Sequence, residues 1–136
     1  MQNPPPVQTA KSSTGLDENL AALLSYIFGW LSGLIFFLIE KESRLVRFHA
    51  MQSLLLNVVA LVIGIALWFL SIVSWVIVSQ ISGILSFLIS VIVGLVAFVL
   101  FAGILVAVIM CLIKAYQGQY FKLPIIGNLA EKFSAK

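Results

Sequence analysis

Three long apolar runs, none containing a charged residue, constrain this chain more than any other feature. They cover Leu20–Ile39, Phe48–Val78 and Ile84–Ile113. A helix rises about 1.5 Å per residue and a bilayer core is about 30 Å thick, so each run is long enough to cross a membrane. With 62% hydrophobic and 10% charged residues, a chain of 136 residues has too little interior to hide these runs in a soluble fold. The sequence predicts an all-α integral membrane protein with three transmembrane helices.

The runs divide the chain into three parts. Residues 1–13 are polar and carry three consecutive prolines, which favours a disordered tail. Residues 14–116 form the expected transmembrane domain, with spans at about 20–39, 48–78 and 84–113. Thr14 and Asp17 resemble a capping box that starts the first helix. Ser79–Gly83 is the one plausible turn between the second and third spans. Three shorter spans within residues 48–116 are an alternative, although no second cluster of helix breakers supports it.

Residues 117–136 form the last part, which is expected to be a cytoplasmic tail. The apolar residues fall on one face of a helix that could begin near Pro124, and the polar residues fall on the other. This pattern predicts a short amphipathic helix lying on the membrane surface. Its apolar face would contain Leu123, Ile126, Leu129, Ala130 and Phe133.

The distribution of Lys and Arg predicts an orientation. Three spans would place the charged link at residues 40–47 and the C-terminal tail on one side, with seven basic residues. The opposite side would hold only Lys11 and the uncharged turn. Cytoplasmic segments carry the excess of Lys and Arg. We therefore expect a multi-pass protein of the cell (plasma) membrane with its N-terminus outside and its C-terminus in the cytoplasm. The residues expected to anchor this topology, or to meet lipid headgroups, are Lys41, Arg44, Arg47 and Lys114.

Small residues recur every four positions in the first and third runs. This spacing lets membrane helices approach closely, although such residues are also common there by chance. It predicts packing faces within one bundle or between copies of the chain. These faces contain Ser25, Gly29 and Gly33 in the first run and Ser86, Ser90 and Gly94 in the third.

Polar residues gather on one side of the second run, at its entry. Such residues in a membrane helix face the protein interior or a water-filled cavity. One hypothesis is a polar vestibule open to the cytoplasm, and the other is a set of hydrogen bonds that fix the helices. The candidate polar face consists of Arg47, His49, Gln52, Ser53 and Asn57.

The sequence offers no pattern typical of catalysis or cofactor binding. The chain has one histidine and one cysteine, and its five carboxylates lie outside the apolar runs. A catalytic nucleophile needs a base and an orienting group, and a metal site needs several ligands. Cys111 is interpreted as a small packing residue. We expect no enzyme activity, no cofactor, no metal and no nucleic-acid partner, and no small-molecule substrate can be identified.

Two segments resemble a known family. The block EKESRLVRFHAMQ at residues 40–52 and the segment GQYFKLP at 118–124 are similar to the small prokaryotic membrane proteins grouped with the Tic-twenty-like proteins. The resemblance covers residues 14–127. It implies a polytopic helical membrane protein in which Arg47, His49 and Gln52 are important. The plastid relatives of that family have four spans, against three expected in this chain.

Two functional hypotheses follow. The first is a non-enzymatic membrane subunit that packs against copies of itself or against another membrane protein. The second is an oligomeric channel or translocation conduit for ions or polypeptide, with its cytoplasmic mouth at the candidate polar face. Headgroup binding by Lys41, Arg44 and Arg47 is a third idea, weakened by the neighbouring Glu40 and Glu42.

Overall fold

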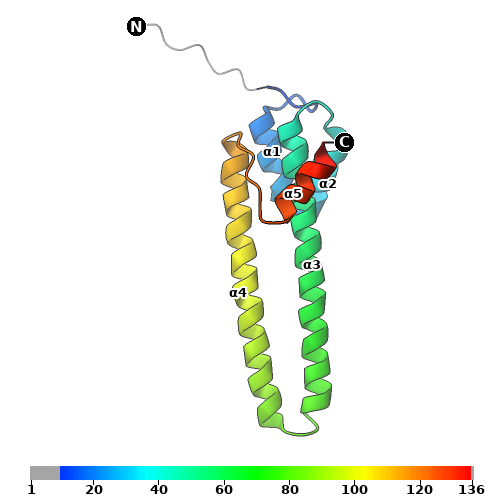
Figure 1. The fold of residues 1–136 in the computed structure, drawn as a ribbon, viewed down its shortest axis with the longest axis vertical. Coiled ribbons are helices and arrows are strands. Elements are labelled where there is room, and N and C mark those ends of the chain that lie inside the picture. The colour runs from blue at the N-terminus through cyan, green and yellow to red at the C-terminus, as the bar shows by residue number, and fades with distance from the viewer. Residues whose placement is uncertain (1–9, 136) are drawn as a thin grey trace, which may run out of the picture. The chain divides into compact units, whose positions relative to one another are not determined.

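The computed structural model describes residues 10–135 of the chain. Within them the fold is all-α, as predicted, and contains no β-strand (Figure 1). The described chain divides into two compact units. We call residues 10–56 and 110–135 the polar unit, and residues 57–109 the apolar unit. The helices are α1 (Glu18–Ile27), α2 (Trp30–Ile39), α3 (Arg44–Val78), α4 (Gly83–Tyr116) and α5 (Ile126–Ser134).

The first apolar run is not one helix, so the continuous helix expected over residues 20–39 is replaced by α1 and α2. The run breaks between α1 and α2 because Gly29 adopts φ 59° and ψ −125°, a conformation that residues with a Cβ rarely tolerate. Ser32 provides hydrogen bonds for two backbone groups at the break. Its hydroxyl accepts a hydrogen bond from the Phe28 N–H at 3.1 Å and donates one to the Ser25 carbonyl at 3.0 Å. At ten residues each, α1 and α2 are about 15 Å long, half the thickness of a bilayer core.

The two short helices form a hairpin whose ends meet. The Ser13 hydroxyl, ahead of α1, donates to Glu40 Oε1 at 2.7 Å, and Glu40 follows the last residue of α2. The Lys41 N–H returns a hydrogen bond to Ser13 Oγ at 2.9 Å. A membrane-crossing helix over residues 20–39 would separate these groups by about 30 Å. In this structure the two ends of the first run therefore lie close together.

The segment before α1 also differs from expectation. Residues 1–9 of the expected disordered tail lie outside the described residues. Residues 10–13 are ordered, since Ser12 is buried and Lys11 forms an isolated bridge with Asp17. The predicted capping box is absent, because Asp17 takes the N-cap position without a side-chain cap hydrogen bond. Gly15, at φ 82°, makes a turn where the sequence suggested a helix start.

The apolar unit is a helical hairpin made by the second part of α3 and most of α4. Its turn lies at residues 79–82, where Ser79–Gly83 was predicted to reverse the chain. The second and third apolar runs each lie within one continuous helix. Both α3 and α4 are long and apolar enough to cross a membrane. Most large apolar side chains of this unit are exposed, including Leu61, Trp68 and Phe98. Exposed apolar surface on this scale suits contact with lipid.

The polar unit holds a small core that includes α5. Ala130 of α5 packs with Phe48 and Met51 of α3. Gly127 is buried at the start of α5. The predicted amphipathic helix is therefore present, beginning at Ile126, and part of it contacts the protein rather than lying free. Of the predicted apolar face, Leu123 and Ala130 are buried while Leu129 and Phe133 stay exposed.

Candidate functional site

His49 and Tyr26 form the centre of a buried hydrogen-bonded cluster in the polar unit. His49 has no exposed surface. Its Nε2 lies 2.9 Å from the Gln119 carbonyl oxygen, which can only accept, so Nε2 carries the proton. Its Nδ1 then accepts a hydrogen bond from the Tyr26 hydroxyl at 3.0 Å. Both ring nitrogens are therefore used in joining α3 to α1 and to the segment that follows α4.

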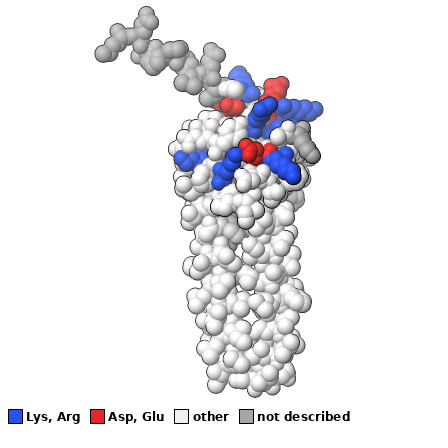
Figure 2. Space-filling model, viewed as in Figure 1, with Lys and Arg blue, Asp and Glu red and all other residues white. Residues whose placement is uncertain are grey.

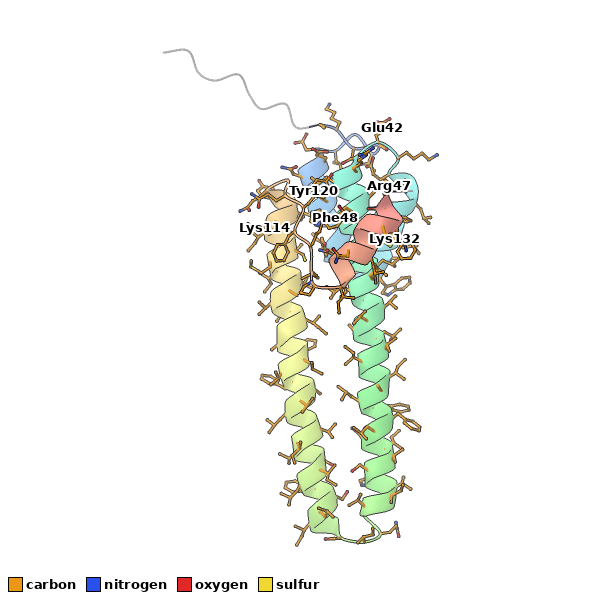
Figure 3. All side chains as sticks on the ribbon, in the orientation of Figure 1. Glu42, Arg47, Phe48, Lys114, Tyr120 and Lys132 are labelled. Carbon is orange, nitrogen blue, oxygen red and sulfur yellow. The ribbon has the colours of Figure 1, made fainter. Side chains whose placement is uncertain are left out.

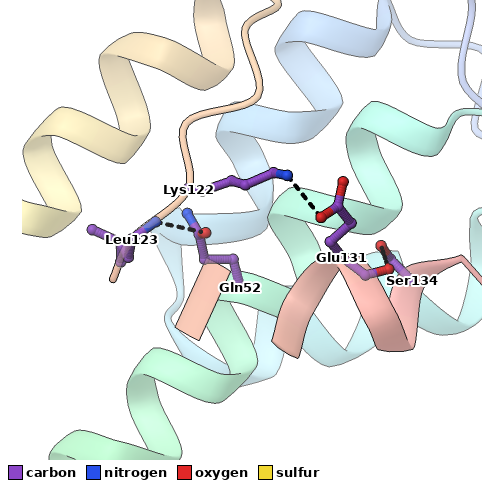
Figure 4. Close-up of polar contacts among 5 residues, drawn as sticks. All are labelled: Gln52, Lys122, Leu123, Glu131 and Ser134. Atoms are coloured by element: carbon purple, nitrogen blue, oxygen red, sulfur yellow. Dashed lines mark hydrogen bonds and ion pairs between the residues drawn. The ribbon is translucent and has the colours of Figure 1, made fainter. Parts of the chain in front are cut away.

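Gln52 extends the cluster by one helical turn and binds the same segment twice. Its amide nitrogen donates to the Phe121 carbonyl at 2.9 Å and lies 3.1 Å from the Tyr26 hydroxyl. Its amide oxygen accepts the Leu123 N–H at 3.3 Å (Figure 4). Gln52 has no exposed surface, and the buried Cys111 sulfur lies 3.3 Å from its nitrogen. A single glutamine thus provides hydrogen-bond partners for the Phe121 carbonyl and the Leu123 N–H, two backbone groups that lie outside any helix.

The other residues of the candidate polar face have separate surroundings. Ser53 is buried and donates to the Gly29 carbonyl at the α1–α2 turn, at 3.2 Å. The Arg47 guanidinium donates to the Glu40 carbonyl at 3.2 Å and to the Ser134 carbonyl at 3.3 Å. It also lies over the Phe37 ring, 5.1 Å from its centroid. Asn57 is half-buried in α3, at the first residue of the apolar unit. His49, Gln52 and Ser53 therefore line the protein interior, not an open vestibule.

Glu40 is a second buried polar centre, and the sequence did not single it out. Its carboxylate accepts N–H groups from Ser13 and Glu42 at 3.0 Å and from Ser43 at 2.9 Å. Burial acts to raise the pKa of the Glu40 carboxyl, but the hydrogen bonds from Ser43, Ser13 and Glu42 outweigh it and hold the pKa below its ordinary value. The ionised carboxylate therefore joins the segment before α1 to the start of α3.

The predicted packing residues lie in two different units. Ser25 and Gly33 are buried in the polar unit, while Gly29 makes the break between α1 and α2, so the three do not share one helix face. A Cβ added to Gly33 would lie 3.0 Å from the Ala50 carbonyl oxygen, which shows that α2 and α3 approach closely there. In the apolar unit, Ser86 is buried and accepts the Ser90 hydroxyl at its carbonyl oxygen, 2.9 Å away. Gly94 is exposed, with nothing within 4 Å of an added Cβ.

The charged residues between residues 10 and 135 all belong to the polar unit, since residues 57–109 contain no Asp, Glu, Lys or Arg (Figure 2). Of the predicted anchors, Lys41 and Arg44 are exposed, and Lys114 donates to Gln119 Oε1 at 3.0 Å. Arg47, labelled in Figure 3, is different, because one of its hydrogen bonds joins α3 to Ser134 at the end of α5 and the other joins α3 to Glu40 after α2. Arg44 makes no hydrogen bond or ion pair with any residue from 10 to 135.

Sequence reasoning missed Tyr26, Glu40 and the backbone of residues 119–123. Tyr26 gave a usable signal, because a phenol in the middle of an apolar run needs a polar partner when it is buried. The backbone partners at residues 119–123 gave no sequence signal, since nearly every residue carries the same N–H and C=O groups. Among residues 10–135, no group of three or more His, Cys, Asp or Glu is placed to hold a metal ion.

Comparisons with known proteins agree with a membrane location. Over 124 residues the chain is 42% identical to a UPF0132 membrane protein of Methanocaldococcus jannaschii, covering 91% of this chain and 94% of the relative. It is 38% identical over 117 residues to a UPF0132 membrane protein of Archaeoglobus fulgidus, covering 86% and 95%. No solved structure matches the chain significantly. The Tic-twenty-like resemblance is not shown by these comparisons and stays a prediction.

A family match covers most of the chain. Residues 14–130, which include α1 to α4 and the first part of α5, match the magnetosome magnetite crystal formation protein family. The matched range contains the whole His49–Gln52 cluster, and it contains Glu40 with its partners Glu42 and Ser43, while Ser13 lies one residue outside it. Together with the archaeal relatives, this match makes the chain a membrane protein of prokaryotic type. The chain belongs to the magnetosome magnetite crystal formation protein family.

Proposed function

We propose that this chain is a non-enzymatic membrane subunit that crosses the bilayer twice and keeps all its charged residues on one side. The observation that carries the proposal is the hydrogen bonding of Ser13 to Glu40, which brings both ends of the α1–α2 hairpin together. The hairpin is too short to cross and enters the bilayer from one side only. Its tip exposes Phe28, Trp30 and Leu31, which suits contact with lipid.

The apolar unit supplies the two crossings. The part of α3 within it, residues 57–78, is about 33 Å long, close to the thickness of a bilayer core. The chain turns at residues 79–82 and returns through α4. Two crossings leave residue 56 and residue 110 on the same side of the membrane, together with the hairpin ends at Ser13 and Glu40.

The distribution of charge supports a cytoplasmic position for that side. All eight Lys and Arg residues lie outside residues 48–113. With two crossings, one side carries eight basic residues and the other carries none, a stronger bias than the seven against one expected from three crossings. The positive-inside rule then places both termini in the cytoplasm. This differs from the N-terminus-outside orientation that three spans would require.

The buried polar side chains of the polar unit are better explained if the chain is a packing subunit or accessory than if it forms a conduit. The polar side chains at the entry of α3 bind other parts of the same chain, and His49, Gln52 and Ser53 have no exposed surface. These three side chains are therefore not exposed to line a passage. The surface that remains for a partner is the exposed apolar face of α3 and α4. A second copy of this chain or another membrane protein would bind that face.

Labelling of introduced cysteines from one side of the membrane tests the topology. In a Cys111→Ser background, Ala10→Cys and Ala135→Cys should react with an impermeant maleimide only from the cytoplasm. Gln80→Cys should react only from the outside, since it lies in the turn between α3 and α4. All three positions are exposed, so none should disturb the fold. Reaction of Ala10→Cys from the outside would restore the three-span topology and exclude this proposal.

A further inference from the structure

A cavity in the polar unit has the chemistry of a lipid phosphate site. It has a volume of about 490 Å³, within the range of about 300–1,000 Å³ typical of ligand pockets. Its walls come from the first turns of α3, the segment after α4, and the end of α5. The lining residues that matter for binding are Arg44, Phe48, Tyr120, Lys122 and Glu131.

Arg44 provides the main reason to expect an anionic ligand. Its guanidinium is exposed and makes no hydrogen bond or ion pair within residues 10–135, in contrast to Arg47, which makes two hydrogen bonds to the fold. A guanidinium presents donors in a planar fork that matches two oxygens of a phosphate. The fold therefore leaves Arg44 available at the wall of the cavity.

Lys122 and Glu131 add two further charges to the cavity lining. They form an ion pair at 2.7 Å, with both side chains partly exposed (Figure 4). The carboxylate of Glu131 repels a phosphate but is largely balanced by Lys122, so Arg44 leaves the cavity with a net positive charge. An exposed ion pair of this kind contributes little to stability and can exchange partners at low cost.

Two aromatic rings form another part of the lining. The Phe48 and Tyr120 rings lie with centroids 5.3 Å apart, and both are labelled in Figure 3. Phe48 is buried and Tyr120 is half-exposed. A tyrosine in this position combines an apolar ring with a hydroxyl donor, the combination found where proteins meet the membrane interface. The glycerol part of a lipid would pack against these rings.

The position of the cavity along the chain points to a lipid and not to a soluble phosphate. Phe48 is the first residue of the charge-free run that continues through α3 to Val78. α5, which contributes Glu131 and Ser134 to the cavity, also exposes Leu129 and Phe133. These two apolar side chains lie one turn apart on α5 and would contact acyl chains.

We propose that this cavity binds the phosphate headgroup of an anionic membrane lipid, with Arg44 as the principal phosphate ligand. Lys122 adds a second cation, and Phe48 and Tyr120 form the apolar wall. The inference rests on the proposed function only in placing the polar unit at the membrane surface. Binding in detergent does not depend on which side that surface faces, so the two proposals fail separately.

The test is a titration of full-length protein in detergent micelles with phosphatidylglycerol that carries a fluorophore on an acyl chain, followed by fluorescence anisotropy. Arg44→Ala should weaken binding about tenfold or more, because a charge-assisted contact to phosphate is lost. Lys41→Ala removes a cation from the same exposed link but not from the cavity, and it should change affinity by less than about twofold. Glu131→Gln should strengthen binding about threefold, because it removes a repulsive charge and releases Lys122.

Three results would overturn the proposal. Equal losses in Arg44→Ala and Lys41→Ala would show general attraction to the basic surface, and weaker binding in Glu131→Gln would contradict the assigned charges. Displacement of the lipid by millimolar glycerol phosphate would assign the cavity to a soluble phosphate ester. Arg44 is exposed and makes no hydrogen bond or ion pair within residues 10–135, so Arg44→Ala should fold, and its circular dichroism and elution from gel filtration should match those of the unchanged protein.

Discussion

Gly127→Ala is expected to release α5 from the polar unit. A Cβ at this position would lie 2.6 Å from both Cα and Cβ of Lys122 and 2.9 Å from its carbonyl carbon. Backbone atoms cannot rotate away from such a contact, so the segment leading into α5 must move. The movement would withdraw Ala130 from its packing with Phe48 and Met51. Overpacking of this kind costs about 1–3 kcal/mol or more.

Limited trypsin digestion in detergent measures this effect. Lys122 and Lys132 lie on either side of Gly127 in the sequence, and cleavage there depends on how often α5 detaches. A loss of about 2 kcal/mol corresponds to roughly a thirtyfold increase in the detached population, and cleavage should accelerate accordingly. Gly103→Ala is the matched control, because an added Cβ there meets nothing within 4 Å. Equal digestion of the two variants would show that α5 does not pack at Gly127 as described.

Gln52→Leu is expected to have an effect of similar or larger size. Leucine has a comparable volume but cannot bind the Phe121 carbonyl or the Leu123 N–H, both of which would lose their partner. Each buried backbone group left without a partner costs about 1–3 kcal/mol. The polar unit should therefore lose roughly 2–5 kcal/mol, since the Tyr26 hydroxyl still has His49 as a partner.

Thermal unfolding in detergent, followed by circular dichroism, measures the loss as a lower Tm. Gln80→Leu is the matched control, because it makes the same substitution at an exposed position in the turn between α3 and α4. That variant should unfold close to the temperature of the unchanged protein. If Gln52→Leu is equally stable, the segment at residues 119–123 is held by something other than the Gln52 amide.

Much of the architecture could be predicted from hydrophobic run length. The runs at residues 48–78 and 84–113 predicted α3, α4 and the turn between them, because a charge-free segment of that length has few alternatives to a membrane helix. The amphipathic pattern at the C-terminus likewise predicted α5. These features depend on local composition and periodicity, which the sequence displays directly.

The first run shows where such reasoning fails. Its twenty apolar residues satisfy the length criterion for a span, yet Gly29 and Ser32 make a break that turns the chain back. A glycine in a membrane helix is also an ordinary packing residue, so its backbone conformation could not be read from its identity. This one residue separates the continuous helix that was predicted from the two helices α1 and α2 that the structure contains.

The candidate polar face was partly predictable. The sequence placed His49, Gln52 and Ser53 on one helix face and left open whether they face water or the protein. The structure shows them buried, with partners far away in the chain, such as Gln119 and Phe121. Those partners are backbone carbonyls, so their side chains carried no information about the contact. Long-range contacts of this kind depend on the tertiary fold and have no local sequence signal.

The distance between the segment before α1 and the segment after α2 tests the central claim most directly. Spin labels at Thr14→Cys and Lys41→Cys, in a Cys111→Ser background reconstituted into bilayers, would report it by double electron–electron resonance. Both positions are exposed and flank the Ser13–Glu40 contact. The hairpin predicts a separation well below the core thickness of about 30 Å. A separation equal to or greater than that thickness would show that residues 20–39 cross the membrane and would contradict the two-crossing account.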